Sequence, residues 1–256
     1  NFMEHFYLTR KLLIFLFWTA LWQAASMAVG NSILLVGPAD VLKTLIALAA
    51  TADFWKTIAC SAGKIFLGFF LAFAAGIFLG TASFRLPILE ELLAPVIALM
   101  KSIPVASFVI LALIWIGSEN LCIFISFLVV LPMIYLNTLA GLRSTAPELL
   151  EMADVFHVPF FRRIRYLYLP ALLPYLISGC RVALGMSWKS GVAAEVIGTP
   201  AWSIGKQLYL SKTWLDTASL FSWTLVIIAV SAVFERIILF LLSRIPCGTP
   251  YKEEGK

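Results

Sequence analysis

The feature that most constrains this chain is a series of long stretches that carry no charged residue. Leu12–Val29 has 18 uncharged residues, Ile65–Phe84 has 20 and Thr217–Phe234 has 18. A helix needs about 20 apolar residues to cross the hydrocarbon core of a bilayer, so each stretch is long enough to span a membrane. Because lipid offers no hydrogen-bond partner to the backbone, the series predicts an all-α integral membrane protein.

Three further apolar stretches complete the set. Ser102–Ser118 has 17 uncharged residues, and we expect Pro87–Met100 to extend it as one helix that is interrupted near Pro104. Leu121–Leu142 carries no charge, and Leu167–Ile197 is apolar apart from three charged residues. The sequence therefore predicts six transmembrane helices.

The composition excludes most other kinds of protein. Apolar residues make up 61% of the chain and charged residues only 13%, whereas soluble domains have about 25% charged residues. The net charge of +5 is too small and too scattered for a nucleic-acid-binding surface. The four cysteines stand alone without a CxxC spacing, so we expect small core residues rather than metal ligands or a disulfide framework.

Basic residues predict the orientation in the membrane. With both termini in the cytoplasm, ten Lys and Arg residues lie on the inner side and four lie in outer loops, which is the asymmetry that membrane insertion favours. The inner ten are Arg10, Lys11, Arg85, Arg143, Arg162, Arg163, Arg165, Arg244, Lys252 and Lys256, and the outer four are Lys43, Lys56, Lys206 and Lys212. Outside, we expect Pro38–Ala50 to form an amphipathic surface helix and Gly198–Asp216 to form a loop with room for a short helix.

The stretch Ser144–Pro170 between two predicted spans is the most informative part of the chain. Thr145–Glu148 has the form of a capping box, with a proline just inside the helix start. An apolar stripe follows, and Val158–Pro159 ends the predicted helix. The stripe consists of Leu149, Leu150, Met152, Ala153 and Phe156. Such a helix fits either a groove on a partner protein or the membrane surface, and its residues alone leave both open.

This loop resembles the EAA loop of ABC-importer permeases. The EAA pattern has Glu-Ala-Ala, three residues, Gly, and a fixed spacing to an Ile-x-Leu-Pro ending. Four residues match at the same spacing, namely Glu151, Ala153, Leu169 and Pro170. At three positions the chain departs from the pattern, with Met152 in place of the first Ala, His157 in place of Gly and Leu167 in place of Ile. The following stretch Leu172–Glu195 is similar to the fifth span of the nitrate/sulfonate/taurine group, and the resemblance covers roughly residues 55–242.

The resemblance implies a type I ABC importer fold in a multi-pass protein of the bacterial inner membrane. The chain would be a permease subunit that forms the path for a small solute, such as a sulfonate, a nitrate-like anion or a vitamin precursor. Its partners would be two copies of an ATP-binding subunit, a second permease copy and an extracytoplasmic substrate-binding protein. ATP and Mg would bind to the ATP-binding subunit, so this chain is expected to hold no cofactor and no catalytic residue.

By the same resemblance, the loop helix is a coupling helix that seats in a cleft of the ATP-binding subunit. The residues expected at this contact are Leu150, Glu151, Met152, Ala153, Phe156 and His157. At the glycine position of the pattern, His157 is less favourable than Gly in the left-handed turn that ends many helices. The domains expected are residues 1–54 (first span and outer helix), 55–246 (type-1 permease domain) and 247–256 (cytoplasmic tail).

Three charged residues in the predicted fifth span, Arg181, Lys189 and Glu195, are candidates for the translocation path. Arg181 lies about 11 residues, or roughly 16 Å, into the helix, near mid-bilayer, where an arginine costs about 2.5–3.5 kcal/mol. We therefore expect its helix face, which Glu195 nearly shares, to point into the protein. Arg181 would be held by backbone carbonyls or by groups such as Ser178 or Asn137, or it would border the path of an anionic solute. Lys189 is long enough to reach the outer surface.

One sequence signal for helix packing lies in the second predicted span. Gly76 and Gly80 form a GxxxG pattern, which allows two membrane helices to approach closely. We expect it to serve packing within the chain.

The alternative interpretation is a secondary transporter that needs no ATPase. Such a transporter normally carries intramembrane acids for ion coupling, and only Glu195 and Glu235 qualify, both near predicted helix ends. An integral-membrane enzyme would need a polar cluster with histidine or paired carboxylates. With His5 and His157 as the only histidines, we expect neither such a cluster nor a metal site.

Overall fold

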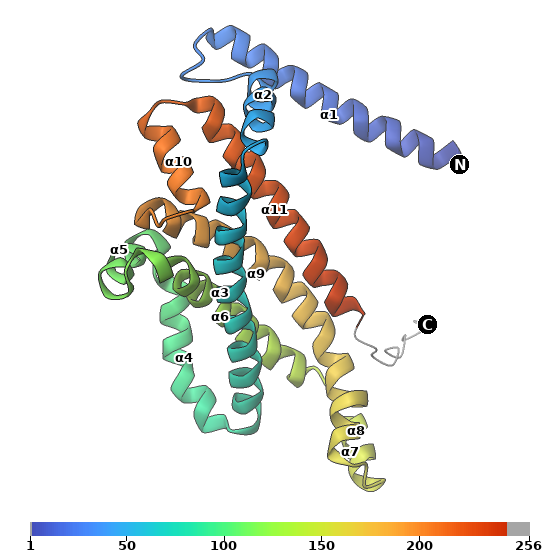
Figure 1. Ribbon diagram of the computed structural model, residues 1–256. Helices are drawn as coiled ribbons and strands as arrows, with labels where there is room; N and C mark the ends of the chain where they lie inside the picture. Colours follow the sequence, from blue (N-terminus) through green and yellow to red (C-terminus); the bar gives the residue numbers. More distant parts are fainter. Residues whose placement is uncertain (1, 245–256) are drawn as a thin grey trace.

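The computed structural model describes residues 2–244, with side chains from residue 9 onward. All regular elements in this part of the chain are helices (Figure 1). In chain order they are α1 (Phe2–Val29), α2 (Pro38–Ala49), α3 (Ala52–Arg85), α4 (Pro87–Ser102), α5 (Val105–Ile116), α6 (Ser118–Arg143), α7 (Pro147–Val155), α8 (Phe160–Arg163), the π-helix η1 (Ile164–Tyr168), α9 (Leu169–Gly198), α10 (Ile204–Thr213) and α11 (Thr217–Ser243). The expected tail 247–256 lies outside the described residues.

Five helical stretches are long and apolar enough to cross a membrane, and a sixth span arises when α4 and α5 are taken together. These two helices are bent by 107° at the break between them. The break follows from Pro104, which has no N–H to continue α4 and holds Ile103 in extended backbone with ψ 124°. The predicted interruption near Pro104 is confirmed, and it divides the segment into two helices at a sharp bend rather than leaving one interrupted helix.

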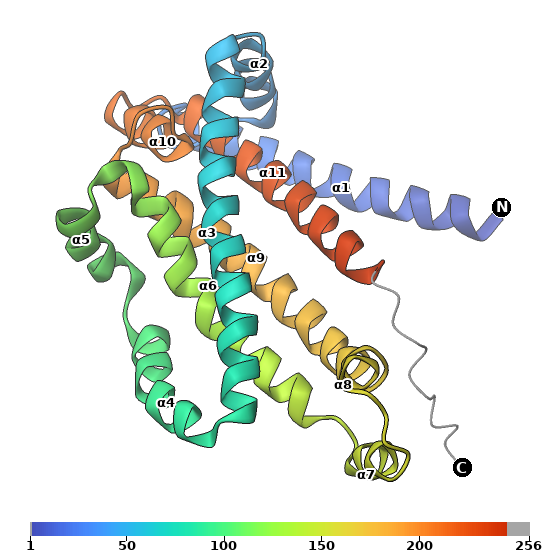
Figure 2. The same ribbon diagram turned by 60° about the horizontal axis from the view of Figure 1, so that its bottom comes forward.

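Helix α6 lies at the centre of the bundle and packs along both α3 and α9 (Figure 1, Figure 2). The contact with α3 depends on glycines. A Cβ atom on Gly76 would lie 2.8 Å from the Cβ of Ile134, and one on Gly80 would lie 2.8 Å from the Cβ of Thr138. No side chain fits in this space, so the expectation that the GxxxG pattern packs helices within the chain is confirmed.

The contact between α6 and α9 is equally close. A Cβ atom on Gly179 would lie 2.6 Å from the Cγ of Asn137, and one on Gly191 would lie 2.8 Å from the hydroxyl oxygen of Ser126. Close backbone approach therefore buries α6 on both sides. Membrane helices associate in this way because lipid tails are as apolar as the side chains that they would replace.

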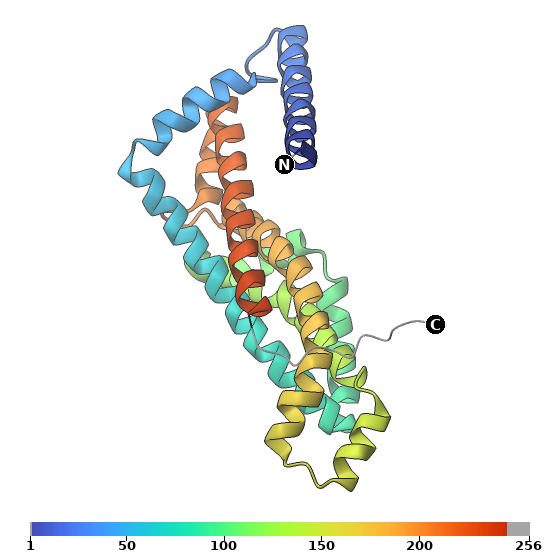
Figure 3. The same cartoon turned by 90° about the vertical axis from the view of Figure 1, so that its right-hand side faces the viewer.

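The outer helices differ in how firmly they attach to this core. Helix α11 packs on α9, and its Phe234 contacts Phe66 and Trp188 with ring centroids 3.6 and 6.3 Å apart. Helix α1 projects away from the bundle (Figure 3), and none of its apolar window is buried. A hydrogen bond from the indole of Trp22 to the carbonyl of Val36, at 3.0 Å, ties its end to the following loop. The apolar surface of α1 is thus open to lipid or to another protein.

Helices that do not span gather at the two ends of the bundle, α2 and α10 at one end and α7 and α8 at the other (Figure 1). Helix α2 forms where the sequence predicts a helix over Pro38–Ala50, and only a narrow part of its surface is buried. Val41 is buried, whereas Leu42 and Ile46 are exposed, because the helix rests on α11 along a single stripe. The sequence predicts a loop with room for a short helix over Gly198–Asp216, and α10 is that helix.

The packing of α3 on α6 predicts a sharp difference between two glycines of the same helix. Gly76→Val should overpack the interface, at a cost of about 1–3 kcal/mol or more, and should lower the midpoint of thermal unfolding in detergent. Gly63→Val is the matched control, because a Cβ at Gly63 meets no atom within 4 Å. The same loss of stability in both variants would show that close helix packing is not the cause.

Candidate functional site

The start of the loop helix α7 differs from the predicted capping box. The helix begins at Pro147, as expected, but its N-cap is Ala146, and no side chain caps it. The hydroxyl of Thr145 is buried without a hydrogen-bond partner in the described structure. The capping-box prediction is wrong because Thr145 turns into the protein where α6 ends, instead of toward the free amides of α7.

The end of α7 is a Schellman motif. The N–H of His157 donates to the carbonyl of Asp154 at 3.1 Å, and the N–H of Val158 donates to the carbonyl of Ala153 at 2.9 Å. His157 adopts the left-handed conformation, with φ +47°. The histidine therefore keeps the turn that glycine makes in the EAA pattern, at a steric cost of about 1–2 kcal/mol. The helix ends at Val155, a turn earlier than predicted.

Arg163 in α8 holds this turn in place. Its Nε donates to the carbonyl of Val158 at 2.8 Å, and its Nη2 donates to the carbonyl of Ala153 at 3.0 Å. Its Nη1 pairs with the carboxylate of Asp154. One guanidinium thus binds two carbonyls at the helix end and one carboxylate, and bonds of this charge-assisted kind are the stronger ones. We call this set the Arg163 clamp.

The exposed surface of α7 corrects the predicted docking set at one position. Ala153 is 0% exposed, because the Schellman turn and Arg163 enclose it, so its side chain does not reach a partner. The other predicted residues are open to contact or half-buried. They are Leu150, Glu151, Met152, Phe156 and His157.

Two exposed apolar residues beside this set were missed. Val155 is 74% exposed and lies one turn after Met152 on the same helix face, so the helical periodicity could have found it. Phe161, at 82% exposed, follows the turn in α8, and no periodicity in the sequence indicates it. With Met152 and Phe156, these residues form an apolar surface at the tip of the molecule, which we call the loop tip.

The structure separates the three charged residues predicted for the translocation path. Arg181 and Lys189 are exposed on the surface of the single chain, and Arg181 has no ion pair or hydrogen bond within residues 2–244. The expectation that protein groups hold Arg181 is therefore wrong for the single chain. Asn137, one of the groups expected to hold it, donates instead to the carbonyl of Met133 at 2.8 Å. Between α6 and α9, a cavity of about 250 Å³ is lined in part by Asn137, Ser178 and Val182, and Arg181 is not part of its lining.

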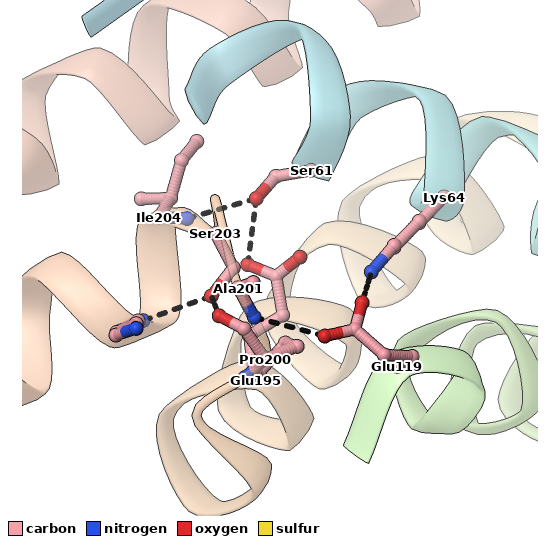
Figure 4. A network of polar contacts seen from close by, with 9 residues as sticks. Ser61, Lys64, Glu119, Glu195, Pro200, Ala201, Ser203 and Ile204 are labelled. Carbon is pink, nitrogen blue, oxygen red and sulfur yellow. Dashed lines mark hydrogen bonds and ion pairs between the residues drawn. The ribbon is translucent and has the colours of Figure 1, made fainter. Parts of the chain in front are cut away.

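Glu195 does not line an open path. It is fully buried, and its Oε2 accepts a hydrogen bond from the hydroxyl of Ser61 at 2.8 Å (Figure 4). The same oxygen accepts a second hydrogen bond from the N–H of Gly205 at 3.1 Å. The hydroxyl of Ser61 in turn accepts from the N–H of Ile204 at 2.8 Å. Although Glu195 nearly shares a helix face with Arg181, it lies within one turn of the end of α9, where α3 and α10 cover that face.

An ion pair completes this polar network. Lys64 lies 2.7 Å from Glu119, whose other oxygen accepts from the N–H of Ala201 at 3.0 Å (Figure 4). Three spans, α3, α6 and α9, thus converge on the loop before α10. Ser61, Lys64 and Glu119 were not predicted from the sequence, because their partners lie 55 to 143 residues away along the chain.

The residues that could bind a metal are dispersed. In the described part of the chain, no three His, Cys, Asp or Glu side chains come together in a group that could hold an ion. The polar groups at the two ends bind backbone amides and carbonyls near helix termini through hydrogen bonds.

Comparison with known proteins supports an assignment to a family of transporters. The family model described as "Binding-protein-dependent transport system inner membrane component" matches residues 72–245. The taurine transport system permease protein TauC of Escherichia coli is 29% identical over 70% of this chain and 67% of its own length. A putative aliphatic sulfonates transport permease protein, SsuC of Escherichia coli, is 32% identical over 77% of this chain and 76% of its own length.

A more distant relative and a solved structure agree with this. The bicarbonate transport system permease protein CmpB of Synechocystis is 27% identical over 62% of this chain and 59% of its own length. The fold is shared with an amino acid ABC transporter solved with histidines, at a TM-score of 0.50 and 19% identity, over 73% of this chain and 91% of that one. The chain belongs to the binding-protein-dependent transport system inner membrane components and is a multi-pass permease subunit of an ABC importer.

Proposed function

We propose that this permease forms the path for a small anionic solute and is driven by a separate ATP-binding subunit that docks on the loop tip. The observation that carries the proposal is the form of α7: a short helix at one end of the bundle whose apolar residues are exposed while its end is fixed by the Arg163 clamp. An exposed apolar surface on a rigid helix fits a groove on a protein partner. The relatives transport taurine, aliphatic sulfonates or bicarbonate by name, which favours a small sulfonate or another oxyanion.

Motion of α7 has a direct route into the membrane. Helix α7 connects through α8 and η1 to α9, and α9 packs along the central helix α6. The Arg163 clamp ties the end of α7 to α8, so a displacement of α7 moves α8 with it rather than bending the turn between them. In this proposal ATP and Mg bind only to the ATP-binding subunit, two copies of which would serve two copies of the permease.

Arg181 and Lys189 are the groups of α9 that we propose face the solute. Both are exposed on the single chain, and an unpaired arginine near mid-bilayer is tolerated only when it faces a water-filled space or protein. A second permease copy against this surface would enclose Arg181 and leave a positive potential for an anion. Glu195 is not part of this proposed path, because its carboxylate is occupied by α3 and α10.

The same proposal includes an orientation in the membrane and a partner on the outer side. Both termini and the loop tip would lie in the cytoplasm, with residues 1–54 as an N-terminal unit and residues 55–246 as the permease domain. The end that carries α2 and α10 would face the substrate-binding protein. The polar network around Glu195 supports this, since it holds the start of α10 against three spans.

Docking on the loop tip predicts that Phe156→Asp abolishes capture of the ATP-binding subunit. Placing a carboxylate in an apolar interface should weaken binding at least about 30-fold, as for other central interface residues. Co-purification of the two subunits from membranes measures it. Ile33→Asp is the control, because Ile33 is also exposed and apolar but lies in the loop before α2 at the opposite end. Equal capture by Phe156→Asp and the unmodified chain would refute docking at this surface.

The Arg163 clamp predicts a variant that binds the ATP-binding subunit but couples ATP hydrolysis poorly to uptake. In Arg163→Met the end of α7 loses three hydrogen bonds, so it should still recruit the ATP-binding subunit but transmit its movement poorly. Uptake per ATP hydrolysed should fall at least about fivefold, the lower range of measured coupling energies. Arg162→Met, an exposed neighbour, should keep normal uptake. An uncoupled phenotype in Arg162→Met, or none in Arg163→Met, would contradict this role.

The proposed role of Arg181 predicts that charge, not shape, matters at this position. Arg181→Met should lower uptake of an anionic solute by about tenfold, and Arg181→Lys should restore most of it, with normal protein levels in both. Ile228→Met, at an exposed apolar position on α11, is the control. Full uptake with Arg181→Met would exclude Arg181 from the path, and loss of assembled protein in both Arg181 variants would indicate a packing role.

A further inference from the structure

A groove at the end of the bundle that carries α7 and α8 has no assigned role. We call this end the basic end, because Arg85, Arg143 and Arg163 lie there. The groove has a volume of about 650 Å³ and lies between the last turns of α3 and the segment that runs from α8 through η1 into α9, with the end of α6 at its base. The elements around it meet at the end that carries α7 and α8 (Figure 2). The lining of the groove includes Ile77, Thr81, Arg85, Phe160, Ile164 and Tyr168.

Most of this lining is apolar. Only Thr81, Arg85 and Tyr168 carry polar side-chain groups, and the hydroxyl of Thr81 already donates to the carbonyl of Ile77 at 2.7 Å. The groove lies where two candidate spans end, which is the boundary between acyl chains and headgroups. Water gains little in such a space because the walls offer it few hydrogen-bond partners. An acyl chain fits the chemistry of these walls.

Arg85 lies at the mouth of the groove and favours a ligand with a negative charge there. It is exposed, and within the described part of the chain it makes no ion pair. Its guanidinium carbon lies 5.2 Å from the centroid of the Phe160 ring in α8. This cation–π contact joins the end of α3 to α8 and holds the Arg85 side chain in place. Arg143 and Arg163 at the same end are paired with acids, whereas Arg85 is free for an anion.

We infer that this groove is a binding site for one anionic phospholipid of the leaflet at the basic end. Its acyl chain would lie against the apolar wall, and its phosphate would bind Arg85. Charge complementarity favours a lipid over a second protein chain, since basic pockets between membrane helices are the usual sites for acidic headgroups. The inference does not depend on the proposed transport function, because it rests only on the groove and on Arg85.

Occupation of the groove would act on the connection between α7 and α9. Phe160, Ile164 and Tyr168, which form one wall, belong to α8 and η1, the only covalent route from the loop helix to α9. A π-helix such as η1 is a less regular element that often marks a functional position. A bound lipid would brace this segment against α3.

Native mass spectrometry of the purified, delipidated full-length chain tests the inference. Phosphatidylglycerol and phosphatidylcholine with the same acyl chains are added at matched concentrations, and the affinity for the first lipid bound is compared. We expect phosphatidylglycerol to bind about fivefold more tightly, the contribution of one arginine near a membrane surface. Arg85→Ala should abolish this preference, and Arg85→Lys should retain it.

Two further variants distinguish the groove from other surfaces. Ile164→Trp should fill the groove and weaken both lipids, whereas Arg162→Ala, which removes an exposed charge outside the lining, should leave the preference unchanged. Glycerol phosphate, which lacks acyl chains, should not compete. Equal binding of the two lipids to the unmodified chain would overturn the inference. So would a preference that survives Arg85→Ala, or lipid binding that Ile164→Trp does not alter.

Discussion

The close approach of α6 to its neighbours is the contact on which the other elements depend. In a bilayer, helices gain little from hiding apolar side chains, so association requires backbones near enough for dense packing. Gly76 and Gly80 supply this on the α3 side, and Gly179 and Gly191 on the α9 side. With α3, α6 and α9 fixed as one unit, the remaining helices are attached to a rigid core, and α1 is left free of it.

At the two ends of this core, polar groups fix segments that apolar packing cannot. At one end, Glu195 binds the first amides of α10 through Gly205 and Ser61, and a Cβ on Gly205 would lie only 2.3 Å from the Cβ of Glu195. At the other end, Arg163 binds the last carbonyls of α7. Both contacts satisfy free groups at a helix terminus, which would otherwise need water. The short outer helices are thereby positioned relative to the spans.

The spans, the glycine contact and the loop helix could be predicted because each depends on a local pattern: uncharged length, four-residue spacing, or a motif of fixed length. The errors concern contacts between distant segments. Thr145 turns away from the helix that it was expected to cap, and Ala153 is covered by an arginine ten residues later. Helical periodicity placed Glu195 near the face of Arg181. Only the three-dimensional packing shows that α3 and α10 cover this face at Glu195 and leave it open at Arg181.

We propose that the chain forms the membrane path of an importer that depends on ATP hydrolysis by another subunit. The most direct test is uptake into proteoliposomes that contain the permease and its ATP-binding subunit, using the solute that the cognate binding protein retains in a binding screen. The account predicts accumulation only when the binding protein is outside and ATP is on the side of the loop tip. Accumulation driven by an ion gradient, without ATP or the ATP-binding subunit, would contradict it and favour a secondary transporter.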